Sequence, residues 1–410
     1  MGTNQKPAKS KICVLGEVCK LIPGHLVVKL AREHGVDKKA RRFCPFSHVV
    51  CLLYAQLTSA VGLNDTCDGL RNHQTKLSTI RGARAPARNT LSHANRERDP
   101  AMMEALFWQT LDHLQKQSVG FGMRYSGLPR RFKKAIYAID STTIALVANC
   151  MDWAKHRRRK AAAKCHLRLN LQTFLPSCAV VEEASHHDDT RAKELCAALQ
   201  PGEIALFDKA YINFAHLFAL HRRGVFWVTR AKDNMKFHVC RKLLRKPAGK
   251  ILRDDLITLK TKKSREQYPE KLRRVEMIVE VDGKQVVMTF ITNNIEWAAS
   301  SVGELYQARW GIEVFFKQIK QTLKICDFLG HSKQAIQWQV WSALLLYILI
   351  RYLAYIHSWS HSFSRLFNLI RGVVWDKYEL HSLIKSYGTA TGPPRLRATP
   401  ESAYLPGLAP

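Results

Sequence analysis

The chain has 410 residues, of which 46% are apolar, so it is long enough for more than one buried core and its composition excludes a disordered protein. Its 64 Lys and Arg against 33 Asp and Glu leave a net charge of +31, which a folded protein tolerates best against a polyanion. Nucleic acid is therefore the predicted partner, and a ribosomal or a membrane-surface protein are the alternatives that composition leaves open.

The cysteines and the termini give little sign of a secreted or membrane protein. Eleven cysteines are scattered without a CxxC pair, which indicates reduced apolar residues rather than a disulfide framework or a zinc site. Residues 1–11 form a basic tail without the apolar stretch of a signal peptide. The most apolar run, Val340–Ile350, is too short to span a bilayer. We expect a core helix there, and a soluble cytoplasmic protein with no membrane partner.

Residues 12–120 are predicted to form a helical N-terminal DNA-binding domain. Apolar residues recur at helical spacing over 24–35, 47–62 and 101–117, and a basic stretch that we expect to be a loop covers 81–99. Helices with a basic turn are typical of modules that dock on DNA. An ordinary helical cap on the following domain is the alternative.

Residues 130–335 change to strand patterns and are predicted to form the catalytic domain. Strands are expected over 133–146, 165–176, 177–185, 203–208 and 225–231, and helices over 190–199 and 213–223. Strands first, then strands that alternate with helices, predict a mixed α/β sheet with helices on both faces.

An insertion over about 232–293 interrupts this alternation of strands and helices. It contains alternating strands, and 16 Lys or Arg against five Asp or Glu lie between Arg230 and Arg274. This predicts a β-rich, basic insertion in the catalytic domain. One long helix is expected over about 300–325, followed by apolar C-terminal helices over 336–388 and a disordered Gly/Pro-rich tail over 389–410.

The long helix carries the most informative pattern in the chain. Five residues fall on one face of it: Tyr306, Arg309, Glu313, Lys317 and Lys320. This face carries one acid among three cations and an aromatic residue. The cations suit contacts to a phosphate backbone, and the acid in the middle suits a metal ligand. A solvated face with mixed charges is the alternative.

The spacing Tyr306-x2-Arg309-x3-Glu313-x6-Lys320 resembles the Y-R-E-K signature of one class of bacterial insertion-sequence transposases of the DDE type. This resemblance implies a ribonuclease-H-like mixed sheet with a β-rich insertion, preceded by a helical domain and followed by C-terminal helices. It also covers the segment Thr90–Arg98, which is similar to a motif of the helical domain found in one branch of these transposases.

The resemblance implies three catalytic carboxylates. Asp140 in AIDST matches the first, Asp208 in LFDKAY the second, and Glu313 the third. Lys209 and Ala210 replace the Arg and Gly that usually follow the second Asp, at positions that do not ligate metal.

Phosphodiester chemistry explains why carboxylates stand at these positions. Two divalent ions can activate the attacking oxygen and stabilise the leaving oxygen, and Mg²⁺ prefers oxygen ligands. The expected cofactor is a pair of Mg²⁺ ions, for which Mn²⁺ can substitute, held by Asp140, Asp208 and Glu313, with Asp140 bridging both.

The function implied is metal-dependent cleavage of DNA at element ends and strand transfer into target DNA, by cut-and-paste transposition. The expected partners are double-stranded DNA, as terminal repeats and as target, and a second copy of the chain in a homodimer on DNA. The expected place is the bacterial cytoplasm, at the nucleoid when bound to DNA. A transposase-derived DNA-binding protein, or a nuclease that no longer transposes, is the alternative.

Further candidates are basic. Besides the stripe of Tyr306, Arg309, Lys317 and Lys320, we expect DNA contacts from Arg230, at the end of a strand. A surface loop over 155–164 is expected to add Arg157, Arg158 and Arg159, unless this is a plain solvated charge run. The segment HHDD at 186–189 fits either a metal site or the start of a helix.

Overall fold

A computed structural model of the chain describes residues 7–38, 40–60, 62–122, 132–145, 155–156, 160–183, 188–281, 283–322, 330 and 332–387. The chain divides into two compact units. Unit 1 takes in residues 1–122, 144–163 and 316–400, and unit 2 takes in residues 123–143, 164–315 and 401–410. The helices before the sheet and those after it therefore belong to one unit, although they are far apart in sequence.

The first part of unit 1 is helical, as predicted. Helix α3 shows the signals that begin and end a helix. It begins at Pro45, where the Cys44 side chain accepts a hydrogen bond from the Ser47 N–H, and it is followed by Ser59 in a left-handed conformation. The helices are α1 (Val14–Lys20), α2 (Gly24–Glu33), α3 (Pro45–Thr58), α4 (Leu63–Asn72), α5 (Gln74–Ser78), α6 (Arg88–Glu97) and α7 (Ala101–Gln117).

The expectation of a loop over 81–99 is wrong, because α6 occupies most of that segment. Leu91, Ala94 and Asn95 follow helical spacing and are buried, so a short amphipathic pattern outweighs the many charges. Asn95 Oδ1 lies 2.8 Å from Nε2 of His48, and the centre of the His48 ring lies 4.4 Å from that of the tilted Trp338 ring. The motif that is similar to a transposase N-terminal domain thus has a packing role in this unit.

The C-terminal part of unit 1 consists of α13 (Lys333–Ile356), α14 (Phe363–Gly372) and α15 (Leu380–Tyr387). The prediction of a core helix around Val340–Ile350 is confirmed, since these residues are all buried and α13 packs on α3, α6 and α7. By length and composition α13 passes for a membrane span, but 89% of its apolar window is buried inside the protein. Burial by other helices accounts for its apolar sequence.

Unit 2 is built on a mixed sheet. Its strand order is β3-β1-β5-β6-β10-β9-β8-β7, with β4 paired to β3. β1, β5 and β6 run parallel, and from β6 through β10, β9 and β8 to β7 each strand is antiparallel to its neighbour. The strands are β1 (Ile136–Ala145), β3 (Lys160–Asn170), β4 (Leu175–Glu183), β5 (Ile204–Phe207), β6 (Phe226–Arg230), β7 (Phe237–Lys242), β8 (Ile251–Leu259), β9 (Leu272–Val281) and β10 (Lys284–Thr292).

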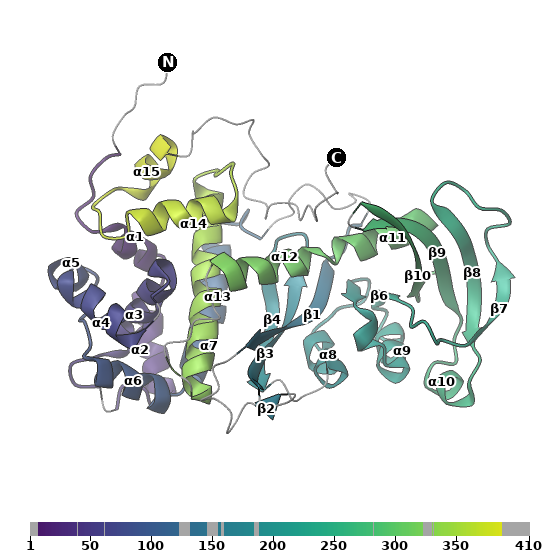
Figure 1. Ribbon diagram of the computed structural model, residues 1–410, viewed down its shortest axis with the longest axis horizontal. Coiled ribbons are helices and arrows are strands. Elements are labelled where there is room, and N and C mark those ends of the chain that lie inside the picture. Colours follow the sequence, from purple (N-terminus) through teal and green to yellow (C-terminus); the bar gives the residue numbers. More distant parts are fainter. Residues whose placement is uncertain are drawn as a thin grey trace, which may run out of the picture. The chain divides into compact units, whose positions relative to one another are not determined.

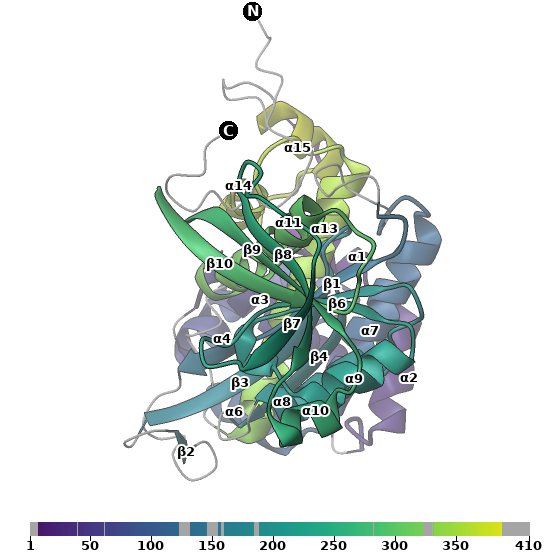
Figure 2. The ribbon, with the colours of Figure 1, turned by 90° about the vertical axis from the view of Figure 1, so that its right-hand side faces the viewer.

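Helices cover both faces of this sheet (Figures 1 and 2). Helices α8 (Asp188–Cys196), α9 (Phe214–Arg222) and α10 (Lys262–Gln267) lie along one face, and α11 (Ala299–Ala308) and α12 (Gly311–Lys317) lie along the other. The core beneath α8 and α9 centres on buried Phe207, Trp227 and Tyr268. The predicted mixed α/β sheet with preceding and following helices is confirmed.

Several predicted boundaries are wrong. The strand expected over 165–176 instead ends at Asn170, and a turn with Phe174 in a left-handed conformation leads into β4. The loop expected over 155–164 forms strand structure at both ends, since β2 (Lys155–His156) pairs with the first residues of β3. The β-rich insertion is confirmed in its strands, but β10 pairs with β6, so these strands extend the main sheet.

Candidate active site

Two of the three candidate carboxylates lie side by side at the end of a parallel ladder. Ile139 of β1 pairs with Phe207 of β5, so Asp140 and Asp208 are the next residues on neighbouring strands. Equivalent positions on parallel neighbours point to the same face of a sheet. The strand expected over 133–146 is observed as β1, which continues past Asp140 to Ala145. The pairing with β5 extends to Ile139, one residue before Asp140.

The third carboxylate joins the first through an arginine. Arg309 Nη1 donates to Asp140 Oδ2 at 3.2 Å, and Arg309 Nη2 donates to Glu313 Oε1 at 2.7 Å. The Arg309 side chain is only 6% exposed, while that of Glu313 is 49% exposed. One buried guanidinium therefore connects a strand residue to the helix that covers the sheet.

Tyr306 brings the second carboxylate into the same arrangement. Its hydroxyl donates to Asp208 Oδ1 at 3.4 Å, and its ring lies 4.7 Å from the ring of Phe290 on β10. Tyr306 and Arg309, which the stripe predicts as DNA contacts, thus both bond to the candidate acids in this structure. Arg230 follows Thr229, which pairs with Phe207 on β5, so Arg230 stands at the level of Asp208 on the next strand.

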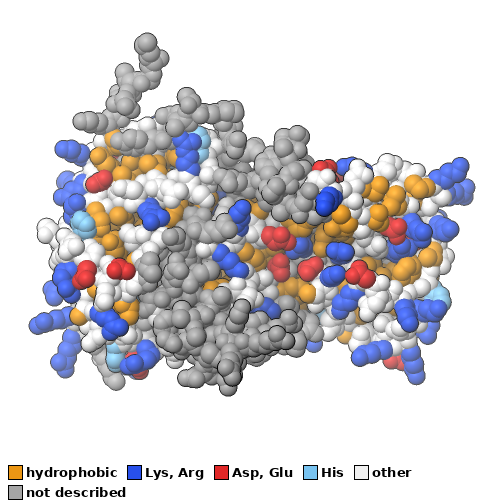
Figure 3. Space-filling view, in the orientation of Figure 1, with side chains coloured by type: hydrophobic (Ala, Val, Ile, Leu, Met, Phe, Trp, Pro, Cys, Tyr) orange, Lys and Arg blue, Asp and Glu red, His pale blue; other side chains and the backbone are white. Residues whose placement is uncertain are grey.

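The electrostatics of Asp140 show that the three acids interact. The pKa of the Asp140 carboxyl is raised to about 6, mainly by burial and to a smaller extent by the nearby charges of Asp208 and Glu313. Arg309 and the backbone N–H of Ser141 act in the opposite direction. Each of the two neighbouring acids affects Asp140 less than Arg309 does in the opposite direction, so the arginine is the main charged partner of this carboxylate. In Figure 3, acidic side chains gather over the strands of unit 2.

The predicted single helix over 300–325 is broken. The N–H groups of Arg309, Trp310 and Ile312 bond three residues back rather than four, which separates α11 from α12. Gly311 permits the approach of the β3–β4 turn, because an added Cβ would lie 3.0 Å from Phe174 Cζ. Ile312 and Phe315 of α12 are both buried.

The remaining candidates fall in unit 1, in α8 or outside the described residues. Lys317 ends α12, and Lys320 lies in a π-helical segment, η3 (Gln318–Thr322), which belongs to unit 1. Arg157, Arg158 and Arg159 lie outside the described residues, as do His186 and His187. The two aspartates of HHDD fall in the first turn of α8, which begins at Asp188.

A buried ion pair that the sequence does not reveal holds the chain just before α11. Arg273 of β9 makes two bonds to Asp254 of β8, from Nε at 2.8 Å and from Nη2 at 2.7 Å. Its Nη1 also donates to the carbonyl oxygens of Ile295 and Trp297. This network fixes the segment that leads from β10 into α11, and so the helix that carries Tyr306 and Arg309.

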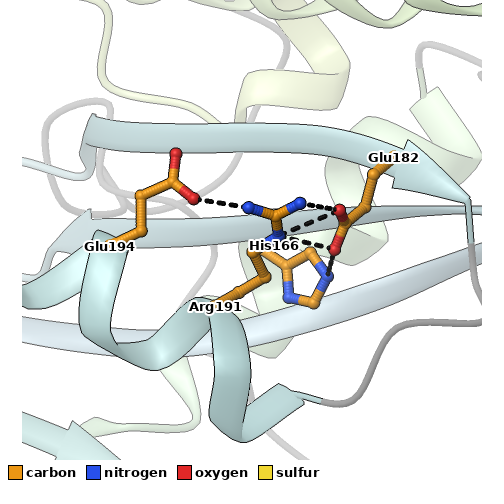
Figure 4. A network of polar contacts seen from close by, with 4 residues as sticks. All are labelled: His166, Glu182, Arg191 and Glu194. Carbon is orange, nitrogen blue, oxygen red and sulfur yellow. Dashed lines mark hydrogen bonds and ion pairs between the residues drawn. The ribbon is translucent and has the colours of Figure 1, made fainter.

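A second polar network anchors α8 to the sheet (Figure 4). Glu182 of β4 accepts from Arg191 Nε at 2.9 Å and lies 3.1 Å from His166 Nε2, and Arg191 also donates to Glu194 at 2.8 Å. Alternating strand residues such as His166 and Glu182 give no sequence signal for this pairing. Its partners come from two strands and a helix, so only the fold brings them together.

Comparison with known proteins adds two family matches. The family model described as "Transposase DDE domain" matches residues 131–349. A second model, described as "Domain of unknown function (DUF4372)", matches residues 10–81.

The curated relatives carry transposase names. The chain is 28% identical over 302 residues to a "Putative transposase y4zB" of Sinorhizobium fredii, covering 73% of this chain and 80% of that protein. It is 28% identical to a "Probable transposase for insertion sequence element IS5377" of Geobacillus stearothermophilus, covering 54% and 58%. A "Transposase InsG for insertion sequence element IS4" of Escherichia coli is 25% identical, with coverage of 45% and 42%.

One solved structure, a piggyBac transposase synaptic complex with hairpin DNA, aligns with 94% of this chain and 85% of that chain. Its TM-score is 0.45 and its sequence identity is 10%.

The Arg273–Asp254 pair gives a test of how α11 is held. Asp254→Asn is expected to lower the free energy of unfolding by about 3 kcal/mol, because it leaves a buried guanidinium without its counter-charge. Arg253→Ala is the matched control: this residue of the same strand is 64% exposed and lies 3.8 Å from Glu276, and its loss is expected to cost less than about 1 kcal/mol. Urea unfolding followed by tryptophan fluorescence measures both. Equal midpoints for the two variants would contradict a clamping role.

Proposed function

Since this chain belongs to the Transposase DDE domain family, we propose that Asp140, Asp208 and Glu313 form its catalytic centre. The family assignment makes the chain a transposase, an enzyme that cleaves DNA and transfers strands. The resemblance to insertion-sequence transposases is therefore confirmed, and the alternative of a derived protein without transposition is not favoured. Membership of the Y-R-E-K class stays a prediction.

One observation carries the assignment of the centre. Asp140 and Asp208 follow paired residues on neighbouring parallel strands, and Arg309 connects Asp140 to Glu313 on the covering helix. Acids from positions far apart in the chain thus converge on one face of the sheet. Convergence of like charges costs stability unless a cation offsets it, so such an arrangement is typical of functional sites.

The family implies dependence on a divalent metal. The donors present are carboxylate oxygens, which suit hard ions such as Mg²⁺ and Mn²⁺, and their mutual effect on the pKa of Asp140 indicates negative charge that a cation would offset. We propose that Asp140, Asp208 and Glu313 would hold two Mg²⁺ ions. When bound, such ions supply Lewis-acid activation of the attacking oxygen and charge stabilisation at the leaving oxygen.

The surrounding residues have distinct proposed roles. Tyr306 orients the Asp208 carboxylate through its hydroxyl, and Arg230 at the same level offers a cation to a DNA phosphate. Lys317 and Lys320 continue the cationic stripe beyond Glu313. Further phosphate contacts are proposed from Arg157, Arg158 and Arg159 on the basis of charge alone.

The proposed substrate is double-stranded DNA, first the element ends and then the target, in cut-and-paste transposition. Cleavage and joining are the same displacement at phosphorus, with water or a DNA 3′-hydroxyl as the nucleophile. The end of the sheet that carries β7 and β8 gathers Lys and Arg side chains, which suits a phosphate backbone (Figure 3). We place the protein in the bacterial cytoplasm, at the nucleoid, where this substrate lies.

We also propose that a homodimer acts on DNA, because two ends that are inserted together must be held together. A subunit that cut alone would release a broken end without its partner.

The catalytic assignment predicts the effect of neutral substitutions. Asp140→Asn, Asp208→Asn and Glu313→Gln are each expected to slow metal-dependent nicking of end-containing DNA by at least about a thousandfold, because several kcal/mol of transition-state stabilisation are lost. DNA affinity is expected to stay within about threefold of wild type, because it comes from many phosphate contacts.

Asp233→Asn is the matched control, since this acid is exposed and pairs only with Lys209 in the described structure. It is expected to nick DNA at the wild-type rate. Nicking and gel-shift assays on the same preparations decide the matter. Near-normal nicking by any of the three variants would remove that residue from the centre.

The cationic stripe predicts a change in salt dependence. Lys317→Ala and Lys320→Ala are each expected to reduce the slope of log Kd against log salt by about 1, because each removes one phosphate contact. Lys385→Ala, an exposed lysine of α15, is expected to leave the slope unchanged. Titrations at several salt concentrations measure this slope, and an unchanged slope would contradict the phosphate contacts.

The homodimer is tested by mass photometry of the same protein–DNA complexes, which is expected to find two copies of the protein. Single copies would contradict the dimer.

A further inference from the structure

Arg309 occupies the place between two of the three candidate metal ligands. Its two terminal nitrogens bond to Asp140 at 3.2 Å and to Glu313 at 2.7 Å, one carboxylate each. Its guanidinium lies 5.3 Å from the centre of the Tyr306 ring, and its Nε is buried without a hydrogen-bond partner. The positive charge of this arginine is therefore paired with the two acids, while its Nε–H group makes no hydrogen bond.

The same acids are not arranged to hold an ion. Within the described ranges, no group of three or more His, Cys, Asp or Glu side chains is gathered closely enough to bind a metal. The donor types fit a hard cation, but a guanidinium stands where a cation would have to approach Asp140 and Glu313. Two cations that share the same carboxylates repel each other, so the arginine and a metal ion compete.

The position of Glu313 makes the competition reversible. Arg309 and Glu313 stand four residues apart on the α11–α12 stretch, and the Glu313 side chain is half exposed. The Arg309 side of this pair is buried, but water can solvate the half-exposed Glu313 carboxylate once the guanidinium leaves it, so the Glu313 side can exchange partners. A phosphate offers the planar guanidinium two oxygens in a matching geometry, which makes it a suitable new partner.

We propose that Arg309 is an internal counter-ion that keeps the centre from binding metal until a DNA phosphate draws the guanidinium away. This inference rests on the proposed function, because it assumes that the three acids are the metal ligands. In the DNA-free protein Arg309 offsets the charge of Asp140 and Glu313. With DNA bound, the guanidinium pairs with the backbone and the carboxylates become free for metal. Metal and DNA then favour each other's binding by the same factor, as thermodynamic linkage requires.

Metal binding to the DNA-free protein tests this directly, with Mn²⁺ alone as the probe and the electron paramagnetic resonance signal of free Mn²⁺ as the readout. Arg309→Gln is expected to bind Mn²⁺ at least about tenfold more tightly than wild type, because the competing charge is gone. Arg309→Lys keeps the charge but loses the two-pronged geometry, so it is expected to fall between the two. Circular dichroism verifies that each variant is folded.

Arg230→Gln is the matched control, since it removes one positive charge from a neighbouring strand but not the guanidinium that bonds to the acids. It is expected to change Mn²⁺ affinity much less than Arg309→Gln. Should Arg309→Gln fail to fold, Arg309→Lys still tests the proposal, because it is expected to bind Mn²⁺ more tightly than wild type. Affinities of the Arg309 variants equal to or weaker than wild type would overturn the proposal.

A double variant separates this inference from the catalytic assignment. Adding Asp140→Asn to Arg309→Gln is expected to abolish the gained Mn²⁺ affinity. If the double variant binds as tightly as Arg309→Gln, the metal is not at these acids and the proposed centre fails. If Asp140→Asn weakens binding in every background but Arg309→Gln gives no gain over wild type, the centre stands and the counter-ion role alone fails.

Discussion

The hydrogen bond between Arg309 and Asp140 joins residues 169 positions apart in the chain. The rest of the centre depends on it, because the guanidinium offsets the negative charge of the carboxylates. The chain as a whole carries a net charge of +31, yet Asp140 is mostly buried near two further acids, and burial, with a smaller contribution from Asp208 and Glu313, raises its pKa to about 6. Folding must therefore supply a cation locally, and the buried guanidinium of Arg309 does so. The proposed centre is thus an acidic site within a strongly basic chain, which is what a cation-dependent attack on a phosphate would need.

The scaffold holds this centre from both sides. On the sheet side, the pairing of Ile139 with Phe207 places two aspartates at adjacent positions. On the helix side, Arg273 is paired with Asp254 and donates hydrogen bonds to two backbone carbonyls of the segment before α11. The antiparallel strands that follow β6 therefore do more than enlarge the sheet, because one of their ion pairs positions the helix with Tyr306 and Arg309.

Much of this could be predicted from sequence where local pattern and chemistry coincide. The resemblance of AIDST and LFDKAY to the family's motifs indicates Asp140 and Asp208, and the spacing from Tyr306 to Lys320 indicates Glu313. The strands of the insertion and the burial of Val340–Ile350 follow from alternation and from apolar length. These features depend on the period of an element, which the chain carries locally.

What could not be predicted depends on contacts between distant segments. Helical periodicity gives no sign that i→i+3 hydrogen bonds break the helix near Arg309, or that Gly311 meets the turn at Phe174. The stripe suggests that Arg309 faces DNA, but only the fold shows it bonded to Asp140. The many charges of 81–99 conceal α6, whose few buried residues decide its structure.

A change of ligand chemistry at Asp140 tests most directly whether these acids hold the metal. A thiolate binds soft and borderline ions and is a poor ligand for Mg²⁺. Asp140→Cys is expected to be inactive in DNA nicking with Mg²⁺ and to regain nicking with Mn²⁺, while Asp140→Ala regains none with either ion. Nicking by Asp140→Cys that is equal in both ions, or absent in both while Asp140→Ala responds to Mn²⁺, would contradict a direct metal contact at this residue.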